Sequence, residues 1–465
     1  MACPTPGPGL EYTLVSSTDV RVTASASNQS RSESVVGINP TNSQNMICAS
    51  KKFIDPQKYR YTISTSFTFD GGKSWTESQP PLQPGWEGMT DPDLTFDLFG
   101  NAYLIVEPVT FHVAPPPNDV VGMGMYVLKS ADGGQTWGQP VQLHPDSTDD
   151  KQWITSDMSP TSPHRGAIYA VWAAGEPLRF SRSTDQGATW KGAGTSISGS
   201  QVWGEEAFAP SICVDENGWI HIFWYLAPSQ EIRYTRSIDG GDHFDPPISC
   251  VTGITSLSNA LPNTDNWPHF PNATFRVLTL VTSCAAGSRA LVAWADMREG
   301  VSRIYYRMTI NGGDTWIGPS SGQQLLPFYP QPDQHHFHPQ LSAAANGSIG
   351  CAFYEFGLKN NKHLIDVLAT YSCSDGDYFS TPIKVTDQPW DPAVNAPFSH
   401  GDPNVTFIGE YFGFDASNNN FAVVWTDTRT GVQELFFDLA SLVLIRIPIR
   451  RLESAASHSN QPPSP

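Results

Sequence analysis

Short apolar strands separated by turns dominate the hydropathy pattern of the chain. Runs such as WIHIFWY (219–225), ALVAWAD (290–296) and FAVVWTD (421–427) each follow a second strand-like run that ends in a tight turn. A third run comes next, such as EIRYTRS (231–237). Strands of this length bounded by turn residues are typical of antiparallel sheets, and helical periodicity is nearly absent. The pattern therefore predicts an all-β fold.

An eight-residue motif recurs after the third strand of most units, with SADGGQTW at 130–137 as a clear copy. Copies start at 68, 130, 183, 237, 309 and 372, the last with Ser374 in place of Asp. Asp in a tight turn accepts backbone N–H bonds, and Gly adopts the positive φ that other residues resist. We predict that each octet closes a hairpin between the third and fourth strands, with its final Trp or Phe packed inward.

The octets start 53 to 72 residues apart, which suits one four-stranded blade each. We expect a single seven-bladed β-propeller of four-stranded antiparallel blades over residues 10–445, with six blades as the alternative. The last unit has no octet, and residues 10–24 are expected to supply its fourth strand and remove the open edges. Residues 453–465 are predicted to be disordered. The expected blades are 30–85, 90–145, 150–197, 205–253, 273–325, 336–388 and 407–440 with 10–24.

The octet resembles the Asp-box, or BNR, repeat of the sialidase-like β-propeller superfamily, and its copies cover most of the chain. WADMREG (294–300) and WTDTRTG (425–431) also resemble segments of bacterial sialidase-like BNR proteins. The resemblance implies a carbohydrate-active protein, a glycoside hydrolase of exo-sialidase type on an anionic or complex glycan. The F/Y-R-I-P motif of sialidases has no counterpart in residues 28–40. The same repeat also occurs in other glycosidases, lectin-like propellers and non-catalytic proteins.

Charge narrows the range of partners. Lys and Arg total 27 against 45 Asp and Glu, a net charge of −18, which disfavours binding to nucleic-acid phosphates or anionic lipid. The sequence contains no run of 18 apolar residues, so no membrane-spanning helix is predicted, and no apolar leader is visible. The scattered cysteines and few lysines favour a secreted or extracellular protein. A glycan is the expected partner, and local arginines would have to hold any anionic group.

In the family's fold, residues that enter the first strand and leave the second strand of each blade share one rim. Entering residues are Arg31, Glu33, Asp91, Asp93, Lys151, Trp153, Glu205, Glu206, Arg276, His336, His338, Glu410 and Tyr411. Leaving residues are Lys51, Lys52, Glu107, Glu176, Tyr225, Asp296, Arg298, Tyr354, Glu355, Asp427 and Arg429. A mixed polar rim with no shared chemistry is the alternative interpretation.

Sialidase-type chemistry needs arginines that hold a carboxylate, a Tyr nucleophile with a Glu partner, and an Asp acid–base. By position, the catalytic candidates are Tyr411, Glu206 and Asp91, and the substrate-binding candidates are Arg31, Arg276, Arg298 and Arg429. Arg298 and Arg429 have another interpretation. Each ends a W-x-D-x-R sequence, and residues two apart on a strand share a face, which favours structural ion pairs with Asp296 and Asp427.

A histidine cluster gives further alternatives. His336 and His338 share a strand face, and His400 and Asp402 lie in a later turn, so together they could hold a divalent metal. One His with a Tyr and an Arg could instead abstract the C5 proton of a uronate, as in propeller-type polysaccharide lyases. Solvated loop histidines are the third interpretation. Besides the hydrolase, the open functions are thus a lyase and a non-catalytic glycan- or protein-binding propeller, and no cofactor is otherwise expected.

Cys351 and Cys373 fall on neighbouring predicted strands, nearly symmetric about the turn at Asn361. They are expected either to form a cross-strand disulfide or to remain as two buried thiols.

Overall fold

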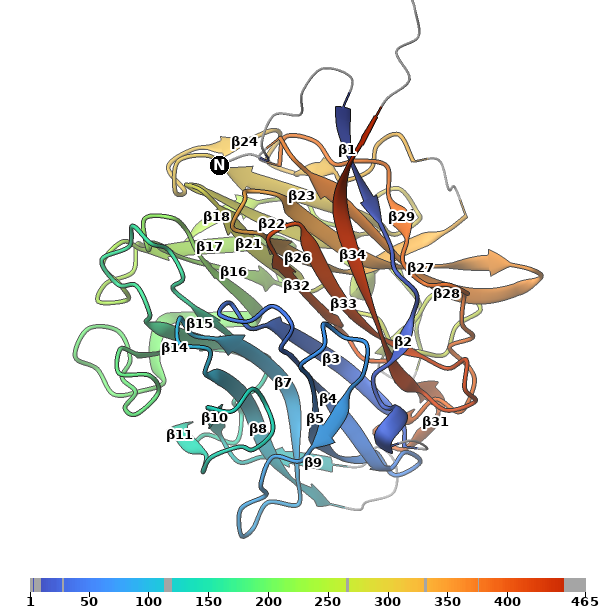
Figure 1. The fold of residues 1–465 in the computed structure, drawn as a ribbon, viewed down its shortest axis with the longest axis horizontal. Coiled ribbons are helices and arrows are strands. Elements are labelled where there is room, and N and C mark those ends of the chain that lie inside the picture. Colours follow the sequence, from blue (N-terminus) through green and yellow to red (C-terminus); the bar gives the residue numbers. More distant parts are fainter. Residues whose placement is uncertain are drawn as a thin grey trace, which may run out of the picture.

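The structure is a computed structural model that describes residues 3, 10–26, 29–112, 119–264, 267–329, 333–374 and 376–446. Within this part of the chain nearly all regular structure is strand, apart from α1 (Leu257–Ala260) and a 3₁₀ turn, η1 (Ala24–Ala26). The prediction of an all-β fold is confirmed, as Figure 1 shows. The segment predicted to be disordered, 453–465, lies outside the described residues.

The strands form consecutive antiparallel groups in chain order. The first group consists of β3 (Arg31–Ile38), β4 (Met46–Asp55), β5 (Arg60–Thr68) and β6 (Thr76–Ser78). The second consists of β7 (Gly88–Phe96), β8 (Ala102–His112), β9 (Asp119–Gly122), β10 (Met125–Ser130) and β11 (Val141–His144). The third group consists of β12 (Gln152–Ser156), β13 (Ile168–Trp172) and β14 (Ala174–Ser183), and the fourth of β15 (Ser200–Val214), β16 (Ile220–Leu226), β17 (Glu231–Ser237) and β18 (Ile248–Val251). β15 also pairs with β14, so these two groups form one sheet.

Three further groups complete the large sheets. The fifth group consists of β21 (Val281–Ala286), β22 (Arg289–Asp296), β23 (Arg303–Thr309), β24 (Trp316–Ile317) and β25 (Gln323–Gln324). The sixth consists of β26 (His335–Ala343), β27 (Ile349–Lys359), β28 (Lys362–Ser372) and β29 (Ile383–Lys384). The seventh consists of β32 (Gly413–Ser417), β33 (Asn420–Asp427) and β34 (Glu434–Arg446). Two short ladders join β19 (Asn263–Thr264) to β20 (Trp267–Pro268) and β30 (Phe398–Ser399) to β31 (Asp402–Thr406).

The last group is completed from the N-terminal side of the chain. β1 (Leu10–Val15) runs antiparallel to β34, with Leu10 opposite Arg446 and Val15 opposite Ser441, and β2 (Val20–Arg21) pairs with the same strand. Figure 1 shows these two ends of the chain, blue and red, side by side. Backbone groups of β34 that would otherwise form an open edge are therefore paired.

The first strands of the groups pack against one another in cyclic order. Each of these strands contacts the next in the order β3, β7, β12, β15, β21, β26 and β32, and β32 contacts β3. Side chains bind neighbouring strands across these contacts: the Ile154 amide donates to Asp93 Oδ2 at 2.8 Å, and the Ile38 amide donates to Asp415 Oδ2 at 2.8 Å. We call these seven strands the inner strands. Their order brings the beginnings of distant segments together.

The predicted turn geometry of the octets is confirmed. In the octet at 183–190, Asp185 accepts hydrogen bonds from the Thr189 amide (2.9 Å), the Thr189 hydroxyl (2.6 Å) and the Ser183 hydroxyl (2.8 Å). The Ser183 hydroxyl in turn accepts from the Gly187 amide at 2.9 Å. The same bonds recur at Asp70, Asp132, Asp239 and Asn311. Each octet thus closes the hairpin that follows its third strand.

The octets also pack against the preceding group of strands. A Cβ at Gly72 would lie 2.1 Å from the Phe437 ring, and one at Gly241 would lie 2.7 Å from the Phe180 ring. The Trp137 indole N–H donates to the Thr65 hydroxyl of β5 at 2.9 Å. Glycine is required at these contacts because φ is positive and no space remains for a side chain. The octet therefore joins neighbouring sheets as well as closing its own.

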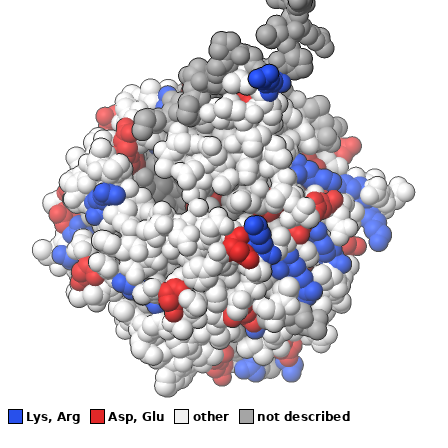
Figure 2. Space-filling model, viewed as in Figure 1, with Lys and Arg blue, Asp and Glu red and all other residues white. Residues whose placement is uncertain are grey.

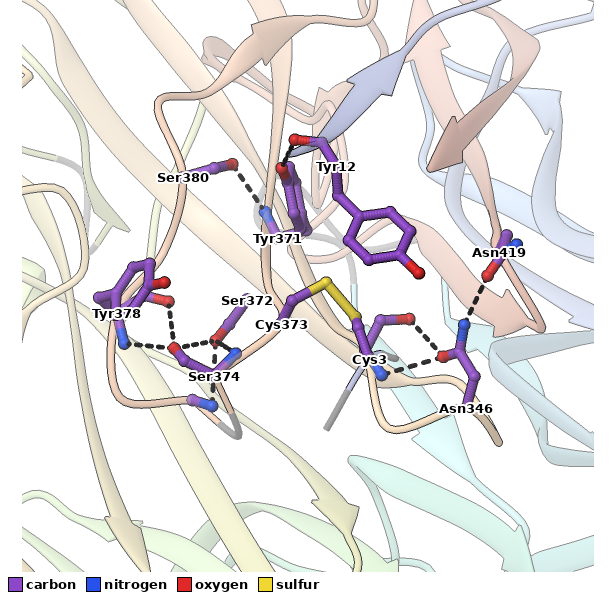
Figure 3. Close-up of a disulfide and its surroundings, with 12 residues drawn as sticks. Cys3, Tyr12, Asn346, Tyr371, Ser372, Cys373, Ser374, Tyr378, Ser380 and Asn419 are labelled. Atoms are coloured by element: carbon purple, nitrogen blue, oxygen red, sulfur yellow. Dashed lines mark hydrogen bonds between the residues drawn. A yellow bond between two sulfur atoms is a disulfide. The ribbon is translucent and has the colours of Figure 1, made fainter. Parts of the chain in front are cut away.

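The disulfide differs from the expected pair. Cys3 bonds to Cys373, whereas Cys351 is a buried free thiol (Figure 3). The register explains the difference, because Cys351 lies opposite Thr370 and Cys373 follows the end of β28. The Tyr371 hydroxyl also donates to the carbonyl of Tyr12 in β1. The bridge and this hydrogen bond both join the N-terminal segment to the sixth group.

Charged side chains of both signs lie interspersed on the face of the molecule drawn in Figure 2, mostly toward its periphery. None of the helices in the described residues has the length and apolar character needed to cross a membrane.

Replacing Asp185 by Ala should lower the free energy of unfolding by about 1–3 kcal/mol, because three donors of the turn lose their acceptor. Asp185→Asn should lower it by less than half as much, because Asn311 fills the same position in another octet. Urea unfolding followed by tryptophan fluorescence measures both values. Equal losses in the two variants would contradict the role given to the side-chain oxygen.

Peptide mapping of the non-reduced protein should recover Cys3 linked to Cys373 and Cys351 as a thiol. Cys373→Ser should lower the free energy of unfolding by about 2–4 kcal/mol, because the bridge restricts the unfolded chain over a separation of 370 residues. Cys3→Ser and the double variant should match this loss. An additional loss in the double variant would show that the two cysteines do not act as a pair.

Candidate functional site

Four inner strands share an unusual backbone feature. Glu33, Asp91, Ala209 and His338 have left-handed φ values of 50°, 49°, 45° and 47°, each where its ladder shifts register. Lys151, directly before β12, has a φ of 58°. This conformation is uncommon for residues with a side chain, it is found at functional sites, and a bulge changes the direction of the side chain. The region around these bulged residues and Lys151 is therefore the candidate site.

Alternating charges connect these positions. Lys51 Nζ lies 2.5 Å from Glu33 Oε2 and 3.1 Å from Asp91 Oδ1. Lys151 Nζ lies 3.0 Å from Asp91 Oδ2 and 2.7 Å from Glu410 Oε2. Arg276 Nε lies 3.0 Å from Glu410 Oε1. We call this set the charge cluster: Glu33, Lys51, Asp91, Lys151, Arg276 and Glu410.

The charge cluster is buried, and its charges compensate one another. Its most exposed side chain, that of Lys151, is only 12% exposed, and Glu33 and Glu410 are almost completely buried. Burying a charge is strongly unfavourable unless an opposite charge is close, and here three acids alternate with three bases. The local arrangement therefore holds cations at the centre of a protein whose net charge is −18.

Aromatic rings surround Arg276. Its guanidinium lies 4.1 Å from the centre of the Trp267 ring and 4.4 Å from that of Phe407. The His400 ring stacks on Trp267 at 5.4 Å and on Tyr59 at 4.7 Å. Trp267 and His400 are only partly buried, so they form the accessible side of the site. Such rings favour a cation through their electron-rich faces.

Two neighbouring carboxyl groups differ in protonation. Burial raises the pKa of Asp91, but the charges of Lys151 and Lys51 lower it by more, so that it lies well below its ordinary value. Burial raises the pKa of the partly buried Asp150 to about 6. The negative charge of Asp91 raises it further, as does the hydrogen bond that protonated Asp150 donates to Asp91. Carboxyl groups whose pKa values are separated in this way can serve different acid–base roles.

The deeper carboxyl groups differ in the same manner. Burial raises the pKa of Glu33 to about 7, and the charge of Asp91 raises it further against the effect of Lys51. Burial also raises the pKa of Glu410, but Arg276 and Lys151 lower it by more, to about 2. Glu33 therefore holds a proton near neutral pH more readily than Glu410 does.

His338 is a buried neutral base beside the cluster. It is 2% exposed, and neither ring nitrogen has a hydrogen-bond partner among the described residues. Burial lowers its pKa to about 3, the charge of Arg276 also lowers it, and Glu410 opposes this effect. An unpaired imidazole of this kind can donate one hydrogen bond and accept another.

The catalytic candidates from the sequence are only partly brought together. Asp91 lies in the charge cluster. The Tyr411 hydroxyl is buried and donates to the Pro92 carbonyl at 3.3 Å, and the ring packs on Trp153. Glu206 is exposed on β15 opposite Pro177, and no hydrogen bond or ion pair described in the structure joins it to Asp91 or Tyr411. The expected Tyr–Glu pair is therefore not assembled.

Of the four candidate arginines, only Arg276 lies in the charge cluster. Arg298 binds Asp296, and Arg429 binds Asp427 at 2.6 Å and Asp19 at 2.6 Å, as the structural interpretation predicted. Asp296 and Asp427 also accept from the indoles of Trp294 and Trp425, so the two W-x-D-x-R sequences form the same local structure. Arg31 Nη2 donates to Glu77 at 2.9 Å. A three-arginine grip on a carboxylate is not formed.

The proposed metal ligands are separated into different environments. His336 binds Glu355 at 3.1 Å, whereas His338 and His400 lie beside the charge cluster. Asp402 accepts from the amide of Asn404. In the described part of the chain, no three His, Cys, Asp or Glu side chains are grouped as a metal site would require.

Sequence reasoning missed four residues that the site description names: Tyr59, Asp150, Trp267 and Phe407. Asp150 comes directly before Lys151 in an acidic pair, and its place before a first strand could have identified it. Trp267 lies in the connection between the fourth and fifth groups, which has no strand-like pattern. Its position next to Arg276 depends on the path of that connection.

Comparisons with known proteins find similarity in structure alone. No family model matches the chain, and no curated protein matches its sequence. A protein of unknown function from Dyadobacter fermentans is similar at 16% identity, with 78% of this chain and 98% of that chain covered and a TM-score of 0.46. A mutant of the NanB sialidase from Streptococcus pneumoniae is similar at 12% identity, with 70% and 65% covered and a TM-score of 0.45.

An α-L-arabinanase from Penicillium chrysogenum is similar at 12% identity, with 78% of this chain and 96% of that chain covered and a TM-score of 0.40. The chain thus spans about two thirds of the sialidase and nearly all of the arabinanase. At this level of similarity, function has to be inferred from the chemistry of the site.

Glu33→Gln should become more stable relative to the wild type as pH rises from 4.5 to 7, by up to about 3 kcal/mol. The reason is that folded Glu33 keeps its proton above the pKa of the unfolded chain, so wild-type stability falls across this window. Urea unfolding at several pH values measures the difference. Glu77→Gln is the control: burial raises the pKa of its carboxyl, but Lys52 and Arg31 lower it by more, so its difference should be flat between pH 5 and 8. A flat difference in Glu33→Gln as well would contradict the assignment.

Proposed function

We propose that this protein is a glycoside hydrolase that acts on an anionic or complex glycan at the charge cluster. The observation that carries the proposal is the Asp91–Asp150 pair, in which hydrogen-bonded carboxyl groups have opposite protonation tendencies near pH 6. Pairs of this kind supply acid–base catalysis of glycosidic bond cleavage. The left-handed backbone at Asp91, Glu33, Lys151 and His338 supports a functional role for the same place.

We further propose that the seven groups of strands are the blades of a closed propeller, of the Asp-box type that the octets resemble. The cyclic packing of the inner strands and the pairing of β1 with β34 support this arrangement. The Cys3–Cys373 bridge supports a secreted protein, because disulfides persist in oxidising compartments.

The proposed mechanism uses Asp150 as the acid. It gives its proton to the glycosidic oxygen as the bond to the anomeric carbon breaks, and then accepts a proton from the water that attacks this carbon. Asp91 holds Asp150 in its protonated form through their hydrogen bond, and the anionic Asp91 and Glu410 stabilise the positive charge that develops on the sugar ring. Arg276 and Lys151 would bind an acidic group of the substrate. Tyr411, buried against Pro92, takes no part in this scheme.

Asp150→Asn should lower kcat for a cleaved aryl glycoside by about 100-fold or more, because the proton donor is lost. The wild-type rate should fall as pH rises through about 6. A panel of aryl sialosides, uronides and neutral glycosides, assayed by release of the aryl alcohol, provides the measurement. Asp146→Asn is the matched control, since Asp146 lies in the same connection but binds Arg179 and Thr148 at the surface.

A second candidate function is a polysaccharide lyase on uronate glycans, favoured by the neutral and unpaired His338 beside Arg276. In that reaction His338 would take the C5 proton, a C4–C5 double bond would form as the C4–oxygen bond breaks, and the protonated His338 would return the proton to the leaving oxygen. An ultraviolet-absorbing unsaturated product that disappears in His338→Ala would replace the hydrolase by the lyase. Binding of glycans without either product would indicate a non-catalytic propeller.

A further inference from the structure

A cavity of about 380 Å³ lies between the fifth and sixth groups of strands. One part of its lining is apolar, with Leu261, Met297 and Phe356. Polar groups lie on the same lining, from Asn272, Asp333, His335 and His363. Cavities of this size with an apolar wall and a few polar groups are typical of small-molecule sites.

The polar groups of the cavity favour a neutral ligand. No Lys or Arg is found among the described residues that line it, and Asp333 brings a negative charge. Burial lowers the pKa of His335 to about 4, and Arg303 and His336 lower it further, so its ring is neutral at neutral pH. An acidic group would thus meet no cation here, whereas hydroxyl groups could bond with the carboxylate, the amide and the imidazoles.

The same segments reach both the cavity and the charge cluster. The connection that contains Trp267 and Arg276 also supplies Asn272 to the cavity, and β26 supplies His335 to the cavity and His338 to the cluster. The Phe270 ring stacks on His335 with centres 4.2 Å apart. The two places are therefore linked through two shared segments of the chain.

Contacts at the edge of the cavity support an extended site. Asn272 Nδ2 lies 3.4 Å from His363 Nε2, which joins the connection to the β27–β28 hairpin. A smaller hollow of about 90 Å³ shares Asn272 and His363 and extends to Thr274 and Asp391. The two hollows thus meet at the Asn272–His363 contact, which lies at the edge of the larger one.

We propose that the cavity is an accessory subsite that binds a neutral sugar unit of the glycan chain whose reacting unit lies at the charge cluster. This inference rests on the proposed function. A pyranose has an apolar C–H face and a rim of hydroxyl groups, and these match the apolar wall and the polar groups of the lining. The subsite gives the protein a preference for longer glycans that carry a neutral unit beside the acidic one.

Saturation-transfer NMR with lactose, cellobiose, maltose and free glucuronate tests the subsite on the full-length protein. At least one neutral disaccharide should bind the wild type, with affinity reduced about tenfold or more in His363→Ala and in Val301→Trp, which fills the cavity. Arg276→Gln, altered at the charge cluster, should keep this binding. His112→Ala, an exposed histidine at the end of β8, is the matched control.

The proposal is overturned if none of the three disaccharides binds, or if His363→Ala and Val301→Trp bind them as the wild type does. It is also overturned if glucuronate alone binds and its binding depends on His363. Failure of the proposed function has a separate signature. In that case no glycoside of the aryl panel is cleaved, while the neutral disaccharide still binds and is still lost in His363→Ala.

Discussion

The turn that each octet forms is the local interaction on which the arrangement of the sheets depends. One Asp or Asn oxygen accepts the amide four residues later, and a Ser or Thr hydroxyl accepts the amide of the glycine. These bonds satisfy donors that a tight hairpin would otherwise leave unpaired. They also hold the glycine face against the preceding sheet, as at Gly72 and Phe437, where the first group meets the last. Because the turn both closes a hairpin and seats it on its neighbour, repetition of one motif fixes the order of the sheets.

That order is what brings the charge cluster together. Glu33, Asp91 and Glu410 come from three different groups, and Lys51 and Lys151 fit between them only if those groups are neighbours around the inner strands. A buried ion network is weak support for stability, since hydrophobic residues of the same volume often serve as well. The left-handed backbone at several of these residues adds to the energetic cost. The proposed function would account for both features, because it requires reactive groups at this place.

Much of the fold and several residues of the site could be predicted from the sequence, because they follow from local patterns. The octets predict their own turns, and the rule that first strands begin at one rim placed Glu33, Asp91, Lys151, Arg276 and Glu410 among the candidates. Wrong or unsupported assignments arose where the outcome depends on register or on side-chain direction. Cys351 shares a sheet with Cys373 but lies opposite Thr370. Arg298 follows the end of β22, and of its two interpretations the structure supports the ion pair with Asp296 over substrate binding.

The site also combines repeated strands with irregular connections. Only the repeated strands could be predicted from the sequence pattern. Bulged residues with a left-handed backbone recur in four inner strands, and two of them, Glu33 and Asp91, belong to the charge cluster. The inner strands β21 and β32 have no such residue, and the irregular connections before them supply Arg276 and Glu410 to the charge cluster. The first of these connections also supplies Asn272 to the cavity. Loops held by a rigid scaffold are free to change without disturbing it, which is why they carry specificity in many proteins. Under the proposed function, the bulged strands and the irregular connections would together hold the reacting groups, and the connection before β21 would contribute to the choice of glycan.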